Sequence, residues 1–302
     1  MEDFTGVLPR MFQQALLPLS REERETMEEL RLREGYPLSA VTGGREWTHG
    51  TWAGRRLREE DLRRVLETAG QGSVHTILEQ LRQGYVTAAG GIRIGVCGEG
   101  AVQEGKLLSF RRITSLALRI PHWVPGIAAP LVPKLLEKGR LQNTLILSPP
   151  GLGKTTLLRD LIRCLSQGEG VVPLRVGVAD ERGELGAGDL RYRLGPRTDV
   201  MENCPKAPAL LMLLRGMGPQ VLAADEITDP ADLEAMTQAA GCGVALVATA
   251  HGSSVGELAL RPLYRDLLAQ GIFRRFVVIA MQGGTRVYRV EKGGAVCDHT
   301  AG

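Results

Sequence analysis

The 302-residue chain is poor in aromatic residues, which make up 4% of it, and it has no paired cysteines. No C-x-x-C pair and no metal-ligand spacing with histidine occurs among Cys97, Cys164, Cys204, Cys242 and Cys297. We therefore expect reduced thiols and neither a disulfide scaffold nor a zinc site. No apolar run approaches the roughly 20 residues of a membrane span, and no signal-type apolar core follows the acidic start M-E-D-F-T. We expect a cytoplasmic protein that reaches any membrane through protein partners.

Nucleic acid is not an expected partner. Few aromatic side chains are available as stacking platforms for bases, and a formal net charge of +3 is too small to indicate such a partner by itself. A group of arginines does crowd one segment, at Arg55, Arg56, Arg58, Arg63 and Arg64. We interpret this group as a solvated helix face paired with the neighbouring acids.

A phosphate-binding loop is the clearest motif. Residues 145–160 read L-I-L-S-P-P-G-L-G-K-T-T-L-L-R-D, an apolar strand followed by a Pro/Gly loop and a helix. Small residues let backbone N–H groups turn inward around phosphate oxygens, and a helix N-terminus attracts the anion. The pattern G-x-x-x-x-G-K-[ST] is met except at its first position, which is Ser148. The predicted nucleotide site comprises Ser148, Pro149, Pro150, Gly151, Leu152, Gly153, Lys154, Thr155 and Thr156.

A pair of acids follows roughly seventy residues later, where the strand V-L-A-A ends in Asp225 and Glu226. If the chain acts as P-loop enzymes do, Lys154 would reach the β- and γ-phosphates of the nucleotide, and the hydroxyl of Thr155 would ligate Mg²⁺. An Asp at a strand tip beside the loop also serves the metal, so we assign Asp225 to the metal shell and Glu226 to the general base. The alternative, two surface carboxylates, is much weaker because a P-loop lies upstream.

Acidic residues also follow the strand before this one, in the sequence D-E-R-G-E at residues 180–184. Parallel strands present their carboxyl ends at one edge of a sheet, where ligands bind. We therefore take Glu181 as a candidate second acid that assists metal or water positioning. For Glu184 and Arg182, an exposed charged loop is nearly as good an interpretation.

His251 ends the next strand, in the sequence T-A-H-G. A lone histidine is more often structural than catalytic. Its expected position at the same sheet edge, one strand on from Asp225 and Glu226, makes it a candidate sensor of the γ-phosphate.

The length of the chain favours two domains. The first part combines short helices, including one over residues 73–81, with β-rich pieces separated by glycine turns such as Gly98-Glu99-Gly100. This texture indicates a compact α+β domain. The stretch from Pro121 to Pro133 contains four prolines and is the expected linker.

After the linker, apolar strands alternate with helices. The helices are centred near Leu158, Leu211, Leu233 and Leu258, and the strands are expected at Thr144 to Leu147, Leu174 to Ala179, Val221 to Ala224, Val244 to Ala248 and Phe276 to Ala280. This alternation predicts an α/β fold with a mainly parallel sheet covered on both faces. A terminal hairpin turns at Gly283-Gly284. We place the domain boundaries at residues 1–125 and 126–302.

The order of the motifs resembles that of the secretion ATPases of type II and type IV systems, RecA-like rings whose motifs are called Walker A, Asp box, Walker B and His box. Within that superfamily the chain is more similar to the stage III sporulation protein AA family of endospore-forming bacteria. The stretches that carry this similarity are residues 84–98, 113–120, 148–160, 195–207, 213–227 and 248–252. The resemblance covers nearly the whole chain and implies a RecA-like P-loop ATPase core after a smaller N-terminal domain.

By that resemblance, the chain would be a cytosolic ATPase of the mother cell that binds ATP and Mg²⁺. It would form a homo-oligomer, a ring of six subunits. It would power assembly of, or transport through, the secretion-like channel between mother cell and forespore, with membrane proteins as partners. The preference for ATP over GTP also rests on the resemblance.

In rings of this kind the N-terminal domain lends arginines to the nucleotide held by the other domain or by a neighbouring subunit, where an arginine stabilises transition-state charge. Of five candidate arginines we name Arg119 and Arg197, and an ordinary ion pair is the alternative for each. The other three are Arg93, Arg112 and Arg215.

The chain also departs from the secretion ATPases. These commonly carry Gly-Glu at the Walker B tip and an arginine two residues later. Here the residues are Asp225-Glu226 and Thr228. The arginine-dependent step of the superfamily is therefore not carried over to Thr228.

Three functions follow from these observations. The leading one is Mg²⁺-dependent ATP hydrolysis at a subunit interface, which drives motion between the domains. A RecA-like, nucleic-acid-stimulated ATPase is the second, and mild charge and scarce aromatics argue against it. A nucleotide-binding scaffold with little turnover is the third, which the Ser148 departure permits without predicting it.

Overall fold

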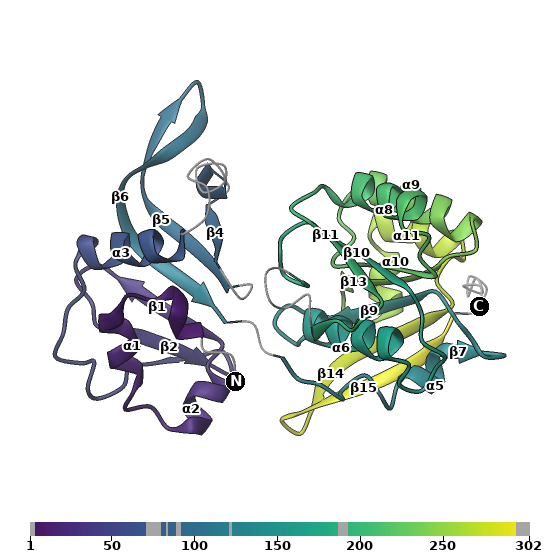
Figure 1. The fold of residues 1–302 in the computed structure, drawn as a ribbon, viewed down its shortest axis with the longest axis horizontal. Helices are drawn as coiled ribbons and strands as arrows, with labels where there is room; N and C mark the ends of the chain where they lie inside the picture. The colour runs from purple at the N-terminus through teal and green to yellow at the C-terminus, as the bar shows by residue number, and fades with distance from the viewer. Residues whose placement is uncertain are drawn as a thin grey trace, which may run out of the picture. The chain divides into compact units, whose positions relative to one another are not determined.

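The computed structural model describes residues 4–70, 80–82, 84–88, 92–120, 123–186 and 193–293. The chain divides into two compact units, Met1–His122 and Trp123–Gly302 (Figure 1). Most of the helix expected over residues 73–81 lies outside the described residues. In the described parts of the chain, no helix is both long and apolar enough to cross a bilayer.

The amino-terminal unit is built on an antiparallel sheet, whose described strands run in the order β3-β2-β1-β6-β5-β4. Its helix α2 begins with the expected capping box, in which Ser20 and Glu23 satisfy each other's backbone N–H groups. The described elements are η1 (Phe4–Val7), α1 (Arg10–Leu16), α2 (Arg21–Thr26), β1 (Glu29–Arg33), β2 (Ser39–Thr42), β3 (Arg45–Trp47), α3 (Glu59–Ala69), β4 (Tyr85–Ala88), β5 (Ile92–Gln103) and β6 (Lys106–Arg119).

The expected break at Gly98-Glu99-Gly100 is not a turn. These residues lie inside β5, where the pairing with β6 shifts register between Cys97 and Gly98. A Cβ added at Gly98 would lie 2.0 Å from the carbonyl oxygen of Arg112, so close approach of the two strands explains the glycine. The turn of the hairpin is Glu104-Gly105, and both residues have positive φ.

The carboxyl-terminal unit contains the predicted α/β sheet. Its described strands run in the order β11-β10-β12-β13-β9-β14-β15, all parallel except β15, which closes the expected hairpin with β14. The described elements are α5 (Val132–Leu135), β7 (Leu136–Glu137), β8 (Arg140–Leu141), β9 (Thr144–Ser148), α6 (Lys154–Gln167), β10 (Val176–Asp180), β11 (Thr198–Glu202), α8 (Lys206–Gly216), β12 (Val221–Ala224), α9 (Pro230–Gly241), β13 (Ala245–His251), α10 (Val255–Ala259), α11 (Pro262–Ala269), β14 (Arg275–Gln282) and β15 (Thr285–Lys292).

Helices cover both faces of this sheet (Figure 1). Successive residues of β9 point to opposite faces: Ile146 packs in the cluster that contains α6, whereas Leu145 and Leu147 pack in the cluster that contains α8, α9 and α11. Both clusters consist mainly of buried aliphatic side chains, which is why the strands read as continuous apolar runs. The predicted doubly covered sheet is confirmed.

The edge strand β11 was not expected from the sequence. Its residues T-D-V-M-E are mostly polar, and all five are only half-buried. An edge strand is less buried by neighbouring elements than a central strand. β11 therefore lacks the continuous apolar run from which the other parallel strands were predicted.

Candidate active site

The strand order decides which motifs meet. Strand β13 lies between β9 and β12, and the parallel strands end at one edge of the sheet. The predicted P-loop after β9 and the Asp225-Glu226 pair after β12 therefore flank the end of β13. That end carries Thr249 and His251.

The predicted P-loop has a backbone conformation that suits a phosphate group. Gly151 and Gly153 have φ of 78° and 93°, a left-handed conformation that glycine adopts without a steric penalty. Helix α6 begins directly afterwards at Lys154, so first-turn amides without intrahelical acceptors point toward the loop. Ser148, at the departure from the motif, is fully buried, and its hydroxyl donates to the carbonyl of Pro149 at 2.8 Å. The loop fits a nucleotide phosphate.

Oxygen ligands for a divalent cation meet beside the loop. The hydroxyl of Thr155 donates to Oδ2 of Asp225 at 2.7 Å. The other carboxylate oxygen, Oδ1, accepts from the hydroxyl of Thr249 at 2.5 Å and from the N–H of Glu226 at 3.1 Å. A hydroxyl and a carboxylate are ligands that Mg²⁺ takes in P-loop enzymes. Thr155 and Asp225, chosen from the sequence, are thus brought together and fit the ion.

Lys154 reaches the same place from the start of α6. Its Nζ lies 2.8 Å from Nδ1 of His251, and Nε2 of His251 lies 2.9 Å from Oε1 of Glu226. A lysine ammonium only donates, so Nδ1 accepts and Nε2 carries the proton that His251 donates to Glu226. Burial lowers the pKa of Lys154, and the nearby Asp225, Glu226 and Glu184 oppose that shift.

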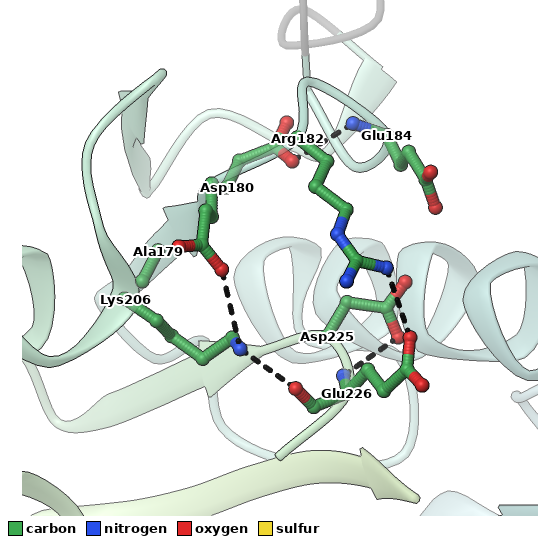
Figure 2. A pocket seen from close by; sticks show the side chains of 8 residues that line it. Ala179, Asp180, Arg182, Glu184, Lys206, Asp225 and Glu226 are labelled. Carbon is green, nitrogen blue, oxygen red and sulfur yellow. Dashed lines mark hydrogen bonds and ion pairs between the residues drawn. The ribbon is translucent and has the colours of Figure 1, made fainter. Parts of the chain in front are cut away.

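Glu226 has a second partner. Its Oε2 forms an ion pair with Nη1 of Arg182 at 3.0 Å, and Figure 2 shows the guanidinium directed at this carboxylate. Arg182, for which the sequence left an exposed loop as the near-equal interpretation, therefore contacts the candidate base.

Asp180 holds the loop after β10 in shape. Its carboxylate is buried and accepts the backbone N–H groups of Glu184, Leu185 and Gly186. Burial raises the pKa of Asp180, against the opposing effect of these N–H groups. Glu181, the candidate second acid, lies at the same loop with its carboxylate 3.5 Å from Nζ of Lys206. Its role in metal or water positioning stays a prediction.

A small cavity opens between the loops that follow β10 and β12 (Figure 2). Charged residues dominate its wall. The lining residues are Ala179, Asp180, Glu181, Arg182, Glu184, Lys206, Asp225 and Glu226.

Three residues of this region received no role from the sequence. Thr249 and Lys206 lie within motifs quoted above, and only the fold shows their contacts with Asp225 and Glu226. For Lys206 a signal existed, because a cation at the start of a helix opposes the helix dipole and needs a partner. Arg286, on β15, has its guanidinium carbon 3.8 Å from the position of a Cβ on Gly153. No local pattern connects that hairpin to the loop.

The two candidate arginines lie elsewhere. Arg197 is bonded to Ser166 through its N–H and its guanidinium, at 2.7 Å and 3.2 Å. Its carbonyl accepts from the N–H of Val176 at the start of β10, so it lies at the amino end of the sheet. Arg119 belongs to the amino-terminal unit, where it is exposed and 3.7 Å from Glu29. A role of either arginine in a neighbouring subunit stays a prediction.

Comparison with known proteins gives both a family and a fold. The family described as sporulation stage III, protein AA matches residues 3–293. Stage III sporulation protein AA of Bacillus subtilis (strain 168) is 36% identical over 311 residues, which cover 100% of this chain and 99% of that protein. The relation to this family thus extends over both units.

Two solved structures are similar to the chain. The ATPase DotB of Yersinia pseudotuberculosis is 16% identical with a TM-score of 0.62, over 96% of this chain and 81% of that one. The pilus retraction motor PilT with bound ADP is 17% identical with a TM-score of 0.60, over 95% and 83%. At these identities the likeness concerns the fold. It confirms the predicted RecA-like core preceded by an N-terminal domain.

Proposed function

Because this chain belongs to the sporulation stage III protein AA family, we propose that it is a Mg²⁺-dependent ATPase that acts during sporulation. It works as a ring of identical subunits, with membrane proteins as partners, on a secretion-like channel between mother cell and forespore. The observation that carries this proposal is the convergence of Lys154, Thr155, Asp225 and Glu226 at one sheet edge. The names of the similar structures, an ATPase and a motor with bound ADP, support it.

The binding step uses the loop after β9. The amides of the first turn of α6 and the ammonium of Lys154 hold the phosphates of ATP. To do so, Lys154 leaves Nδ1 of His251, its partner in this structure. Thr155 and Asp225 would hold Mg²⁺, which neutralises phosphate charge when bound. Arg286 adds a positive charge beside Gly153 of the loop.

The chemical step uses Glu226. Its carboxylate accepts a proton from the attacking water, whose oxygen forms the new bond to the γ-phosphorus while the bond to the leaving ADP oxygen breaks. Arg182 and His251, both within 3.0 Å of the Glu226 carboxylate, hold that carboxylate in its orientation until the water arrives.

The test compares ATP binding, turnover and oligomeric mass of the purified chain with those of Lys154→Ala and Glu226→Gln. Lys154→Ala should abolish nucleotide binding, because the loop loses its only side-chain charge. Glu226→Gln should bind ATP and lose turnover, because the amide cannot take the proton. Lys134→Ala and Glu234→Gln, exposed residues of the same unit, are matched controls.

Other outcomes are equally clear. If the Glu226→Gln variant hydrolyses ATP as fast as the parent chain, Glu226 is not the general base. A parent chain that binds ATP but hydrolyses none in any oligomeric state would favour a nucleotide-binding scaffold. ATPase stimulation by single-stranded DNA that weakens steeply with salt would favour a nucleic-acid motor.

A further inference from the structure

Lys206 is a buried cation at an unfavourable position. It is the first residue of α8, and its side chain is 6% exposed. The positive end of the helix dipole disfavours a cation at this position, and a buried ammonium is costly unless it is paired. Strong compensating contacts are therefore required to keep Lys206 there.

Those contacts converge on the turn that carries the candidate base. Nζ of Lys206 donates to the backbone carbonyl of Glu226 at 2.6 Å and to Oδ2 of Asp232 at 3.2 Å, and it lies 3.5 Å from Oε2 of Glu181. Figure 2 shows the ammonium directed at the Glu226 carbonyl. A single ammonium thus ties the loop after β12 to the loop after β10.

The backbone conformation of Glu226 requires contacts that stabilise it. Its φ is 39°, in the left-handed region that a residue with a side chain rarely adopts and that persists only where its surroundings enforce it. On one side of the residue, the N–H of Glu226 is bonded to the hydroxyl of Thr249 at 2.9 Å. On the other side, Lys206 binds the carbonyl.

Asp232 stabilises the rest of the turn through hydrogen bonds to its backbone. The Oδ2 atom that accepts from Lys206 also accepts the N–H groups of Thr228 and Asp229, each at 3.2 Å. Lys206 and Asp232 together therefore fix the backbone from Glu226 to Asp229, and this backbone sets the direction of the Glu226 carboxylate.

We propose that Lys206 is a positioning residue, which holds Glu226 in its left-handed conformation and so aims the carboxylate at the attacking water. The proposal rests on the ATPase function proposed above. Lys206 acts on the reaction only through Glu226, whereas Lys154 binds the phosphates of ATP. Its loss should therefore change turnover and leave nucleotide affinity alone.

The experiment replaces Lys206 by Met, which has similar length and no donor, and uses Lys134→Met on the exposed surface as the control. Turnover at saturating Mg²⁺-ATP should fall by up to about 100-fold, the effect of displacing a reacting group by about 1 Å. The Kd of ATP should stay within about twofold of the parent value. Hydrogen–deuterium exchange of the peptide that spans residues 226–229 should accelerate, without nucleotide present, and Lys134→Met should change none of these.

A purely structural role gives different results. In that case Lys206→Met lowers the melting temperature and the active fraction, while turnover per active site and exchange at residues 226–229 match the parent, and the proposal is overturned. If Lys206→Met fails to fold, Lys206→Arg takes its place in the test, because arginine keeps the positive charge but places its N–H donors at different positions. Positioning predicts reduced turnover at an unchanged Kd, whereas parent-like turnover overturns it.

The exchange measurement separates this proposal from the proposed function. A parent chain without ATP hydrolysis would remove the ATPase proposal, and Lys206 would then be judged by exchange at residues 226–229 alone. Unchanged exchange there would remove the Lys206 proposal even if the parent chain is an active ATPase.

Discussion

The ammonium of Lys154 lies 2.8 Å from Nδ1 of His251, so the lysine of the predicted P-loop is bonded to the end of the neighbouring strand. Through Nε2, the same ring reaches Oε1 of Glu226 at 2.9 Å. The residue proposed to hold the phosphates and the residue proposed to activate water are therefore joined by one imidazole. Any ligand that draws Lys154 toward itself changes the partner that orients Glu226.

His251→Ala tests this connection. Turnover should fall by up to about 100-fold, because Glu226 loses the donor that orients it and a displacement of about 1 Å can have that effect. The Kd of ATP should be unchanged or lower, since Lys154 no longer has to leave a side-chain partner. Steady-state turnover and titration with a fluorescent ATP analogue measure the two quantities.

His49→Ala, in the amino-terminal unit, is the control for this substitution. Weakened ATP binding with unchanged turnover in His251→Ala would contradict the connection, because it would make His251 a direct phosphate ligand.

The loop after β10 gives a prediction on stability. Asp180→Asn places an amide N–H₂ where the carboxylate accepts three backbone N–H groups, so at least one buried donor loses its acceptor. The free energy of unfolding should fall by about 1–3 kcal/mol. Urea denaturation followed by circular dichroism measures it. Asp199→Asn on the half-buried edge strand β11 is the control, and an equal loss in both variants would show that Asp180 has no special role.

Much of the site could be predicted because its chemistry is local in sequence. Gly151, Gly153, Lys154 and Thr155 occur in one short motif, and the loop geometry follows from their types and spacing. The acids at the end of β12 were found in the same way, from an apolar run that ends in two carboxylates. The central strands were predictable because burial on both faces requires continuous apolar residues.

The strand order, and the side-chain contacts that depend on it, could not be predicted from the sequence. That β13 lies between β9 and β12 is a tertiary fact, and it brings Thr249 to Asp225 and His251 to Lys154. The contact of Lys206, at the start of α8, with the turn at Glu226 is likewise a tertiary fact. Gly98 was misread as a turn residue, since close strand approach and a turn both select glycine.

The thiol of Cys164 should be unreactive in the folded chain. Burial, and then the charge of Asp160, raises its pKa to about 12, and the thiolate is the reactive form. At pH 8 its thiolate fraction is on the order of a thousandfold below that of an ordinary thiol. Iodoacetamide should therefore label the exposed Cys97 and Cys242 long before Cys164, as read by peptide mass spectrometry.

Urea is the control for the alkylation experiment. All these cysteines should be labelled at similar rates once the chain unfolds. Labelling of Cys164 as fast as that of Cys97 in the native chain would contradict both its burial and its raised pKa.

Glu46 should make the amino-terminal unit sensitive to acid. Its carboxylate accepts hydrogen bonds from the guanidinium of Arg33 and, at 2.6 Å, from the hydroxyl of Ser39. These contacts, Arg33 first, lower the pKa of Glu46 from 4.5 to about 2. A carboxyl group with a lowered folded-state pKa stabilises the fold above its unfolded pKa, and this contribution is lost as the pH falls through the folded value. The relevant window is therefore pH 4.5 down to about 2.

Glu46→Gln removes this contribution at neutral pH. Its side chain is 40% exposed, so solvent screening keeps the loss in unfolding free energy to about 1 kcal/mol or less at pH 7. The difference between parent and variant should shrink as the pH is lowered from 4.5 toward 2, because the parent carboxylate is then neutralised. Urea unfolding at several pH values, followed by fluorescence to which Trp47 and Trp52 of the same unit contribute, measures it. Glu67→Gln on the exposed face of α3 serves as control, and a difference that widens in acid would contradict the lowered pKa of Glu46.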